Sequence, residues 1–151
     1  MSFSERIQKE LTAALKAKDE LRLSVLRMLK TALRNREVEK MGPLDDADAI
    51  AVLRALIKQR REAVEEYTKV GRPDRAAQEE KEIAILEGYL PAAVSEDELR
   101  AAIEAAVAEV SAASAKDLGK VMKVVMGHFA GKNVDGKRVN ELVRQRLAAS
   151  G

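Results

Sequence analysis

The side chains that could carry out catalysis are few in this sequence. His128 is its only histidine and it has no cysteine, so no histidine–cysteine pair and no cage of several histidines around a metal can form. Glu79, Glu80, Glu82 and Glu87 could supply paired carboxylates for acid–base chemistry or for a divalent cation. A run of glutamates on a helix is, however, typical of a solvated, charge-balanced face. We therefore predict no catalytic residue, no metal ligand and no cofactor.

Three other positions resemble functional residues only in isolation. Gly119-Lys120 lacks the upstream glycine and the following serine or threonine of a phosphate-binding loop, and no strand precedes it. Ser24 has no evident base partner and is interpreted as an ordinary helix serine. His128 is interpreted as a helix-end residue, where a partial positive charge complements the helix dipole. The chain by itself is therefore not expected to be an enzyme.

Charge is distributed unevenly along the last third of the sequence. From Lys116 onward there are eight lysines and arginines against three acidic residues, a formal charge of +5, although the whole chain carries only +2. The preceding stretch, Pro91 to Ala115, has one arginine against five acidic residues, a formal charge of −4. Since local fields rather than net charge steer polyanions to a surface, the basic tail is the candidate binding region.

The cations of the tail form two groups. Three lysines at spacings of four and three fall on one face of a helix, and three further cations lie in and just after the turn at 131–136. The six predicted RNA-binding residues are Lys116, Lys120, Lys123, Lys132, Lys137 and Arg138. A helix that opens behind Asp135 also offers amide groups suited to a phosphate, but the Asp135 carboxylate would occupy that cap. A solvated basic face with no ligand is the alternative.

Aromatic residues limit the kind of nucleic acid that such a tail could bind. Phe3, Tyr67, Tyr89 and Phe129 all fall on apolar stripes, which leaves little surface for stacking on unpaired bases. Lysines and arginines on a rigid scaffold are sufficient to bind structured RNA through its backbone and shape. The sequence therefore favours structured RNA over single strands.

Composition predicts an all-α protein. The chain has 151 residues, of which 46% are hydrophobic and 3% aromatic, with only three prolines, a balance that favours helices over strands. Because there is no cysteine, a disulfide framework is excluded. The most apolar segments are interrupted by charged residues and fall short of the roughly 20 residues that span a bilayer. We expect a cytoplasmic protein with no membrane partner.

Seven helices are predicted from apolar residues at spacings of three and four. Each follows a residue that can cap a helix start or open its first turn. These residues are Ser2, Asp19, Asp45, Pro73, Ser95, Ser114 and Asp135. Predicted stops are Gly42 with Pro43, Gly71 and Gly131.

The helical pattern breaks at residues 88–91, Gly-Tyr-Leu-Pro. Proline restricts the residue before it and has no amide hydrogen, so a boundary is expected there. We predict an amino-terminal four-helix domain over residues 1–91 and a carboxyl-terminal three-helix domain over residues 95–151.

Several of these segments, taken in order, resemble a known family. KDLGKVM at 116–122, DGK at 135–137 and VNELV at 139–143 resemble the carboxyl-terminal domain of the GatB/YqeY family. In the front half, RLSVLR at 22–27, KQRR at 58–61 and EGYLP at 87–91 resemble the short stand-alone YqeY-like members. The resemblance covers nearly the whole chain, which is identified as a member of this family.

The resemblance implies a function for the tail. In GatB-type subunits the similar tail belongs to the tRNA-dependent amidotransferase and contacts the tRNA, while phosphorylation and amide transfer occur in a large domain that this chain lacks. It therefore implies a non-catalytic adaptor, related to tRNA amidotransferases, that binds tRNA or another structured RNA. Carbon–nitrogen ligase activity with glutamine as amide donor is an alternative by family association only.

A further alternative belongs to a different functional class. The alanine-rich helix from Glu96 to Val110, or the first helical hairpin, could dock a protein partner or a second copy of the chain, without RNA binding. Alanines permit close helix packing, which is the feature that motivates this interpretation.

Overall fold

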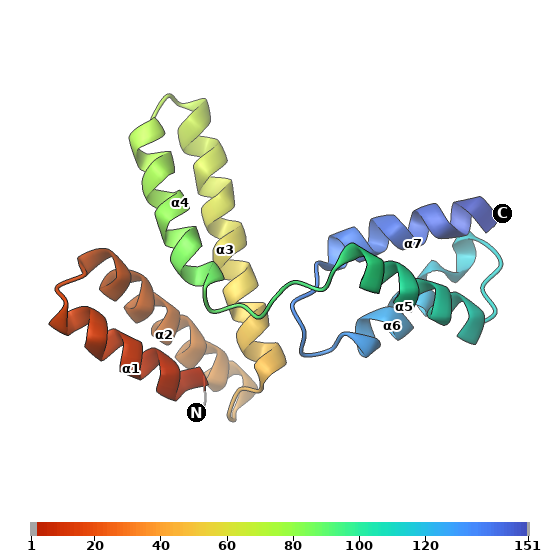
Figure 1. Cartoon of the computed structure of the whole chain (residues 1–151), viewed down its shortest axis with the longest axis horizontal. Coiled ribbons are helices and arrows are strands. Elements are labelled where there is room, and N and C mark those ends of the chain that lie inside the picture. The colour runs from red at the N-terminus through yellow and green to blue at the C-terminus, as the bar shows by residue number, and fades with distance from the viewer. Residues whose placement is uncertain (1–2, 151) are drawn as a thin grey trace. The chain divides into compact units, whose positions relative to one another are not determined.

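The computed structural model describes residues 3–150, which contain seven α-helices, one 3₁₀ helix and no strand (Figure 1). The all-α prediction is confirmed. The chain divides into two compact units, the first ending at Pro91 and the second beginning at Ala92. Ser2, which was predicted to cap the first helix, lies outside the described residues. None of the helices in the described range is long and apolar enough to cross a membrane.

The first unit consists of two helical hairpins. Its helices are α1 (Phe3–Lys16), α2 (Glu20–Lys40), α3 (Asp46–Lys69) and α4 (Pro73–Glu87). α1 packs along α2 and α3 along α4, and α2 also contacts both helices of the second hairpin (Figure 1). Leu26, Leu29, Leu53 and Leu86 are fully buried where the hairpins meet, because the spacing of three and four gathers their side chains on one face of each helix.

Helix starts in the first unit follow the predicted caps. The Asp19 side chain accepts a hydrogen bond from the Arg22 amide at 3.1 Å, and Asp45 forms a complete capping box with Asp48. Pro73 opens α4. Each cap satisfies an amide that has no partner within its helix.

The end of α2 differs from the prediction. Gly42 was expected to stop this helix, but the residue in the left-handed conformation is Met41, with φ 61° and ψ 38°. Met41 is 91% exposed, so packing does not offset the steric penalty of this conformation for a residue with a Cβ.

Tyr89 fixes the end of the first unit against α1. Its ring meets Phe3 edge-on at 6.2 Å between centroids, and the Arg6 guanidinium lies 4.7 Å from the ring centroid. The hydroxyl is buried without a well-formed hydrogen bond, and the buried carboxylate oxygen of Glu10 also has no hydrogen bond, although it lies 3.9 Å from the Arg6 guanidinium. Burial, and secondarily Glu10, raise the pKa of Tyr89 to about 12.

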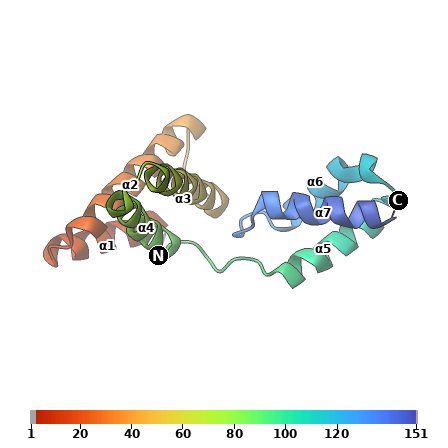
Figure 2. The same ribbon diagram turned by 90° about the horizontal axis from the view of Figure 1, so that it is seen from above.

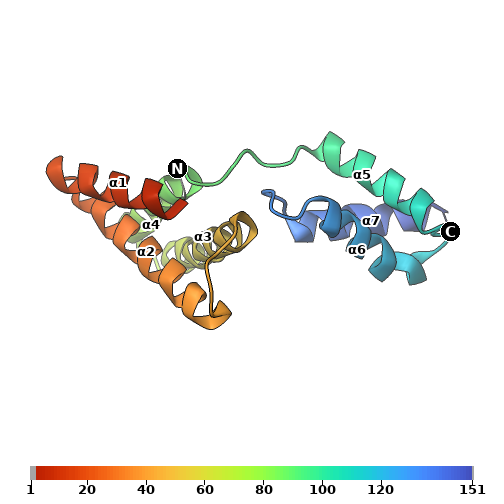
Figure 3. The ribbon, with the colours of Figure 1, turned by 90° about the horizontal axis from the view of Figure 1, so that it is seen from below.

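The second unit is a bundle of three α-helices. It contains α5 (Glu96–Glu109), the 3₁₀ helix η1 (Ala115–Asp117), α6 (Leu118–His128) and α7 (Gly136–Ser150). Figures 2 and 3 show α6 and α7 side by side, and α5 packs on both. The core is mostly aliphatic, with Ile103, Val121, Val125, Val139 and Val143 all buried.

Two ion pairs hold α7 in register against α5. Arg138 pairs with Glu96 and Arg146 with Glu104. Because the partners are eight residues apart on both helices, α5 and α7 run in the same direction, and the short α6, which connects them in the chain, runs in the opposite direction (Figure 1). Arg138 also pairs with Glu141 at 3.1 Å.

The predicted cap at Ser95 forms only in part as a capping box. The Glu98 amide donates to Ser95 Oγ at 3.1 Å, as expected. The Glu98 carboxylate, however, accepts from the Ser95 hydroxyl at 3.1 Å rather than from its backbone amide.

Candidate functional site

The start of α6 is fixed by a network around Asp117. Its carboxylate accepts backbone hydrogen bonds from Ala113 at 2.9 Å and Ser114 at 3.3 Å, which lower the pKa of Asp117 below its ordinary value. The Ser114 hydroxyl accepts from the Lys116 amide at 3.3 Å. This reciprocal cap holds η1 and the first of the predicted lysines in a defined position.

Lys116, Lys120 and Lys123 lie on the solvent side of η1 and α6, opposite the buried Val121 and Val125. All three side chains are exposed. They make no side-chain hydrogen bond or ion pair with any part of the chain that the structure describes. The face predicted from their spacing is therefore exposed. Asp117, three residues before Lys120, attracts that lysine electrostatically without forming an ion pair, so the positive charge of the face is only partly compensated.

Two glycines share this face. Gly127 continues the spacing of the three lysines, four residues after Lys123, and Gly119 lies beside Lys120. A Cβ built at either glycine would have no atom within 4 Å, and neither has a positive φ. Neither packing nor backbone conformation therefore requires glycine here, although alanine would favour the helix. We refer to Lys116, Gly119, Lys120, Lys123 and Gly127 as the α6 face.

The other three predicted residues lie beyond the opposite end of α6. Lys132 is exposed in the turn that follows the helix, and Lys137 is exposed in the first turn of α7. Since α6 has 11 residues and rises about 1.5 Å per residue, its two ends lie about 15 Å apart, and Lys116 precedes the far end. The six predicted residues therefore do not form one cluster.

The predicted phosphate site at the start of α7 is occupied by the chain itself. The Asp135 carboxylate accepts from the Lys137 amide at 3.0 Å. The loop before it is tied to the beginning of the unit by a hydrogen bond from the Val94 amide to the Asn133 carbonyl at 3.0 Å. The Lys137 amide is therefore already occupied and is not available to a phosphate at this end of α7.

The acidic segment at residues 91–115 forms its ion pairs with α7 through arginines. Glu96 and Glu104 of α5 face α7, where they pair with Arg138 and Arg146. The Arg138 guanidinium lowers the pKa of Glu96. Arg138, one of the six predicted residues, is therefore held between two carboxylates, whereas the α6 face has no such partner among the residues described.

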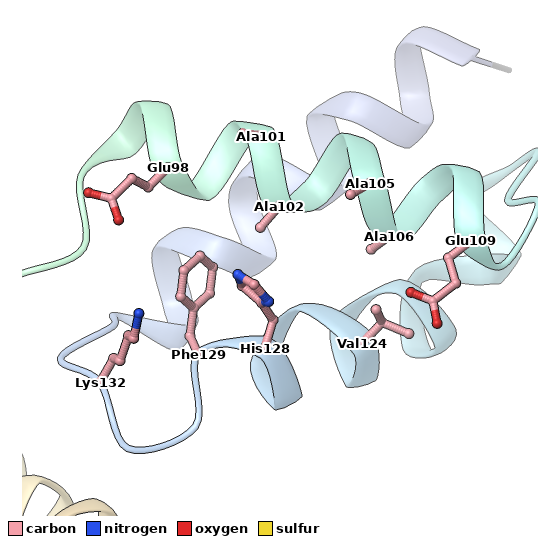
Figure 4. Close-up of a pocket in the computed structure, with 10 residues that line it drawn as sticks. All are labelled: Glu98, Ala101, Ala102, Ala105, Ala106, Glu109, Val124, His128, Phe129 and Lys132. Carbon is pink, nitrogen blue, oxygen red and sulfur yellow. The ribbon is translucent and has the colours of Figure 1, made fainter.

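A shallow groove between α5 and α6 was not predicted from the sequence (Figure 4). It has a volume of about 390 Å³. Its wall on α5 consists of Ala101, Ala102, Ala105 and Ala106. On the α6 side the exposed His128 packs edge-on against Phe129, with 4.8 Å between ring centroids. Lys132 and Glu98 lie at one end of the groove and Glu109 at the other (Figure 4).

The glutamate run at 79–87 is partly structural. Glu82 lies 3.9 Å from Arg60 of α3, and both side chains are largely buried. Burial raises the pKa of Glu82. Glu87 pairs with Arg61 at 2.7 Å, so the basic run on α3 is balanced across the hairpin and not only within its own helix. No cluster of three or more potential metal ligands occurs in residues 3–150.

Comparison with known protein families identifies the chain's relatives. A model described as "Yqey-like protein" matches residues 4–147, nearly the full length. The chain belongs to the YqeY-like family. The family assigned from the sequence motifs is thereby confirmed.

Several fungal members of the family are similar to this chain. All carry the name "altered inheritance of mitochondria protein 41, mitochondrial". The protein from Lachancea thermotolerans is 36% identical over 85 residues, covering 56% of this chain and 46% of its own length. The one from Eremothecium gossypii is 30% identical over 107 residues, which cover 69% of this chain and 58% of the relative. The one from Pyrenophora tritici-repentis is 23% identical over 147 residues, which cover 95% of this chain and 80% of the relative.

The first of these alignments spans about half the length of the relative. The names place these YqeY-like relatives in mitochondria, whereas the sequence led us to expect a cytoplasmic protein here. That expectation remains a prediction for this chain.

Proposed function

We propose that this YqeY-like protein is a non-catalytic adaptor whose second unit binds tRNA or another structured RNA through the α6 face. The observation that carries the proposal is the set of three exposed lysines that remain without an ion-pair partner in residues 3–150. The proposal requires a compartment that contains RNA, which cytoplasm and mitochondria both provide.

The contrast between lysines and arginines in the second unit supports the proposal. Arg138 and Arg146 are neutralised by carboxylates of α5, so their positions have a structural reason. A solvated helix face would gain stability from alternating charges three or four residues apart. On the α6 face the spacing brings three lysines together, with only Asp117 beside Lys120 as a partial counter-charge, and a bound phosphate backbone would stabilise this arrangement.

The glycines of the α6 face support close contact. Because Gly119 and Gly127 have no side chain and face open space, a ligand backbone can approach the helix between the lysines. Phosphates held in this way need no aromatic platform, in agreement with the burial of Phe129 and Tyr89 and with recognition of RNA by shape and charge.

The test is the salt dependence of RNA binding. Affinity for a fluorescently labelled, folded tRNA transcript is measured by anisotropy between 50 and 200 mM salt for wild type and for a variant with Lys116→Gln, Lys120→Gln and Lys123→Gln. Each lost phosphate contact lowers the slope of log affinity against log salt by about 0.9, so the triple variant should lose about 2.7 from its slope.

A matched control separates the α6 face from net charge. Lys58→Gln, Arg75→Gln and Lys81→Gln remove three exposed cations from α3 and α4 of the first unit. We expect this control to bind as wild type does. Equal slopes and affinities for the α6 variant and the control would show that the proposed surface is wrong.

The groove between α5 and α6 favours the second candidate, a protein-interaction module without RNA binding. Its alanine wall would allow a partner helix to approach α5 closely. Ala102→Leu and Ala105→Leu would fill the groove without touching the α6 face. If these changes abolish capture of a partner while tRNA binding is absent in wild type, the interaction function replaces the RNA function.

Carbon–nitrogen ligase activity is a third candidate, by family association only. The pure chain is incubated with mischarged tRNA, ATP and glutamine, and amide formation is measured. We expect no product, and amide formation above a boiled control would contradict the adaptor proposal.

A further inference from the structure

A second basic surface lies on α2 in the first unit. Between Glu20 and Glu37 this helix carries five lysines and arginines and not a single carboxylate. The whole first unit, in contrast, is almost balanced, with 18 basic against 17 acidic residues up to Pro91. The proposed RNA surface on α6 does not account for this segregation of charge.

The five cations of this stretch are not equivalent. Arg22 lies 3.9 Å from Asp19, and Arg36 pairs with Glu39 at 3.4 Å and with Asp48 at 4.0 Å. These two arginines have structural partners. The remaining three are exposed and fall at spacings of three and four, so they share the outer face of α2. They are Arg27, Lys30 and Arg34, which we call the α2 stripe.

The α2 stripe keeps its charge. No side-chain hydrogen bond or ion pair of Arg27 or Arg34 occurs within residues 3–150. Lys30 donates to the neutral amide oxygen of Gln8 on α1 at 2.8 Å, which orients the ammonium group without neutralising it. Arg27 and Arg34 are seven residues apart, about 10 Å along the helix axis.

Helix stability does not explain the α2 stripe. Like charges three and four residues apart repel one another and weaken a helix. On α3, by comparison, the cations at 60 and 61 face carboxylates of α4. A ligand with several negative charges at intervals would remove this repulsion, as a phosphate backbone does.

The surface beside the stripe also fits a phosphate backbone. A hollow of about 250 Å³ between α1 and α2 has Lys30 and Arg34 on its rim, together with Ser4. Ile7 and Leu33 line its apolar floor and Glu37 is the one carboxylate at its edge. Among residues 3–150, no aromatic side chain lines the hollow for base stacking, and the nearby ring of Phe3 packs against that of Tyr89. This chemistry favours backbone contact with helical RNA.

We propose that the α2 stripe binds the phosphate backbone of a structured RNA as a second contact surface, separate from the α6 face. The inference rests on the proposed function, because the ligand is of the same class. The two surfaces lie in different units, so each can be changed without altering the core of the other.

The experiment uses the full chain and a labelled tRNA transcript at 50 and 200 mM salt. Arg27→Gln, Lys30→Gln and Arg34→Gln together should lower the salt slope by about 2.7, so that wild type loses about 40-fold more affinity than the variant over this interval. The Lys58, Arg75 and Lys81 variant described above is the matched control. Thermal melts confirm folding, and removing like-charge repulsion should leave Tm unchanged or higher.

The outcomes separate this inference from the proposed function. If the α6 variant weakens binding and the α2 variant matches the control, this inference alone is overturned. If only the α2 variant weakens binding, the α6 face is wrong and the inference stands. Wild type that does not bind tRNA overturns both. If the α2 variant binds tRNA as wild type does but no longer binds phosphatidylserine vesicles that wild type binds, the assignment of RNA as the ligand of the α2 stripe is overturned.

Discussion

Replacing Gly119 and Gly127 by alanine should stabilise the protein and weaken its RNA binding. The two effects have opposite signs because they have different causes. Stability depends on the helix itself, whereas binding depends on how closely a ligand can approach the α6 face. The double variant therefore tests both the effect of these glycines on helix stability and their effect on RNA binding.

The stability effect follows from the local geometry. An added Cβ at either position would have no atom within 4 Å, and the backbone is not in the left-handed region. Alanine is then favoured over glycine by about 0.5–1 kcal/mol in a helix. Both positions lie within a turn of the ends of α6, so the lower figure applies. The double variant should gain about 1 kcal/mol, or roughly 4 °C in Tm.

The binding effect comes from the same methyl groups. If RNA backbone lies on the α6 face, they push it away from Lys120 and Lys123 and lengthen their contacts. Loss of about one hydrogen bond to a charged group corresponds to about 1.5 kcal/mol, or roughly tenfold weaker binding. Differential scanning calorimetry and tRNA anisotropy on the same preparations measure the two quantities.

The control is Gly42→Ala, at another glycine whose added Cβ would meet nothing within 4 Å and which lies between α2 and α3. Its tRNA affinity should equal that of wild type. A Gly119→Ala, Gly127→Ala variant that is more stable but binds tRNA equally well would refute the close-contact argument. A less stable variant would refute our account of these glycines in the fold.

Three further predictions concern the fold. Tyr89 should ionise at about pH 12. Because its pKa is raised in the folded state, the stability of the fold should decrease between about pH 10 and 12. An ultraviolet titration of wild type should show the ionisation of this tyrosine, and the Tyr89→Phe variant should lack it. Because the pKa of Asp117 is lowered from its ordinary value of 3.8, its carboxylate stabilises the fold above about pH 4, and Tm should decrease as the pH falls below 4. The Asp117→Asn variant should show a weaker dependence of Tm on pH and a lower Tm at pH 7. Met41→Gly should raise stability by about 1 kcal/mol, measured by urea unfolding, since glycine tolerates the left-handed conformation; no gain would contradict the conformation found here.

Helix starts were predictable because they depend on local chemistry. Asp19, Asp45, Ser95 and Asp135 cap the backbone within three residues, so the sequence contains both partners of each bond. The stop at Met41 was not predictable, because a glycine and a proline follow directly and carry the usual signal.

Only the part of the candidate site that depends on local spacing could be predicted from the sequence. The shared face of Lys116, Lys120 and Lys123 follows from helical spacing alone. Whether a cation is free, however, depends on partners far along the chain. Arg138 lies 42 residues from Glu96, and sequence reasoning included it with the lysines. The spacing of four between Lys123 and Gly127 was the available signal for the glycines.

The sequence by itself determined the all-α class, most helix starts and the family, because capping, helical periodicity and ordered motifs act over short separations. The tertiary structure decided which charges remain free, since ion pairs such as Arg146–Glu104 form only when helices pack. It also decided that Glu82 turns inward against Arg60 and that alanines of α5 line a groove. Burial and long-range pairing depend on the positions of whole helices, which no local segment of the sequence specifies.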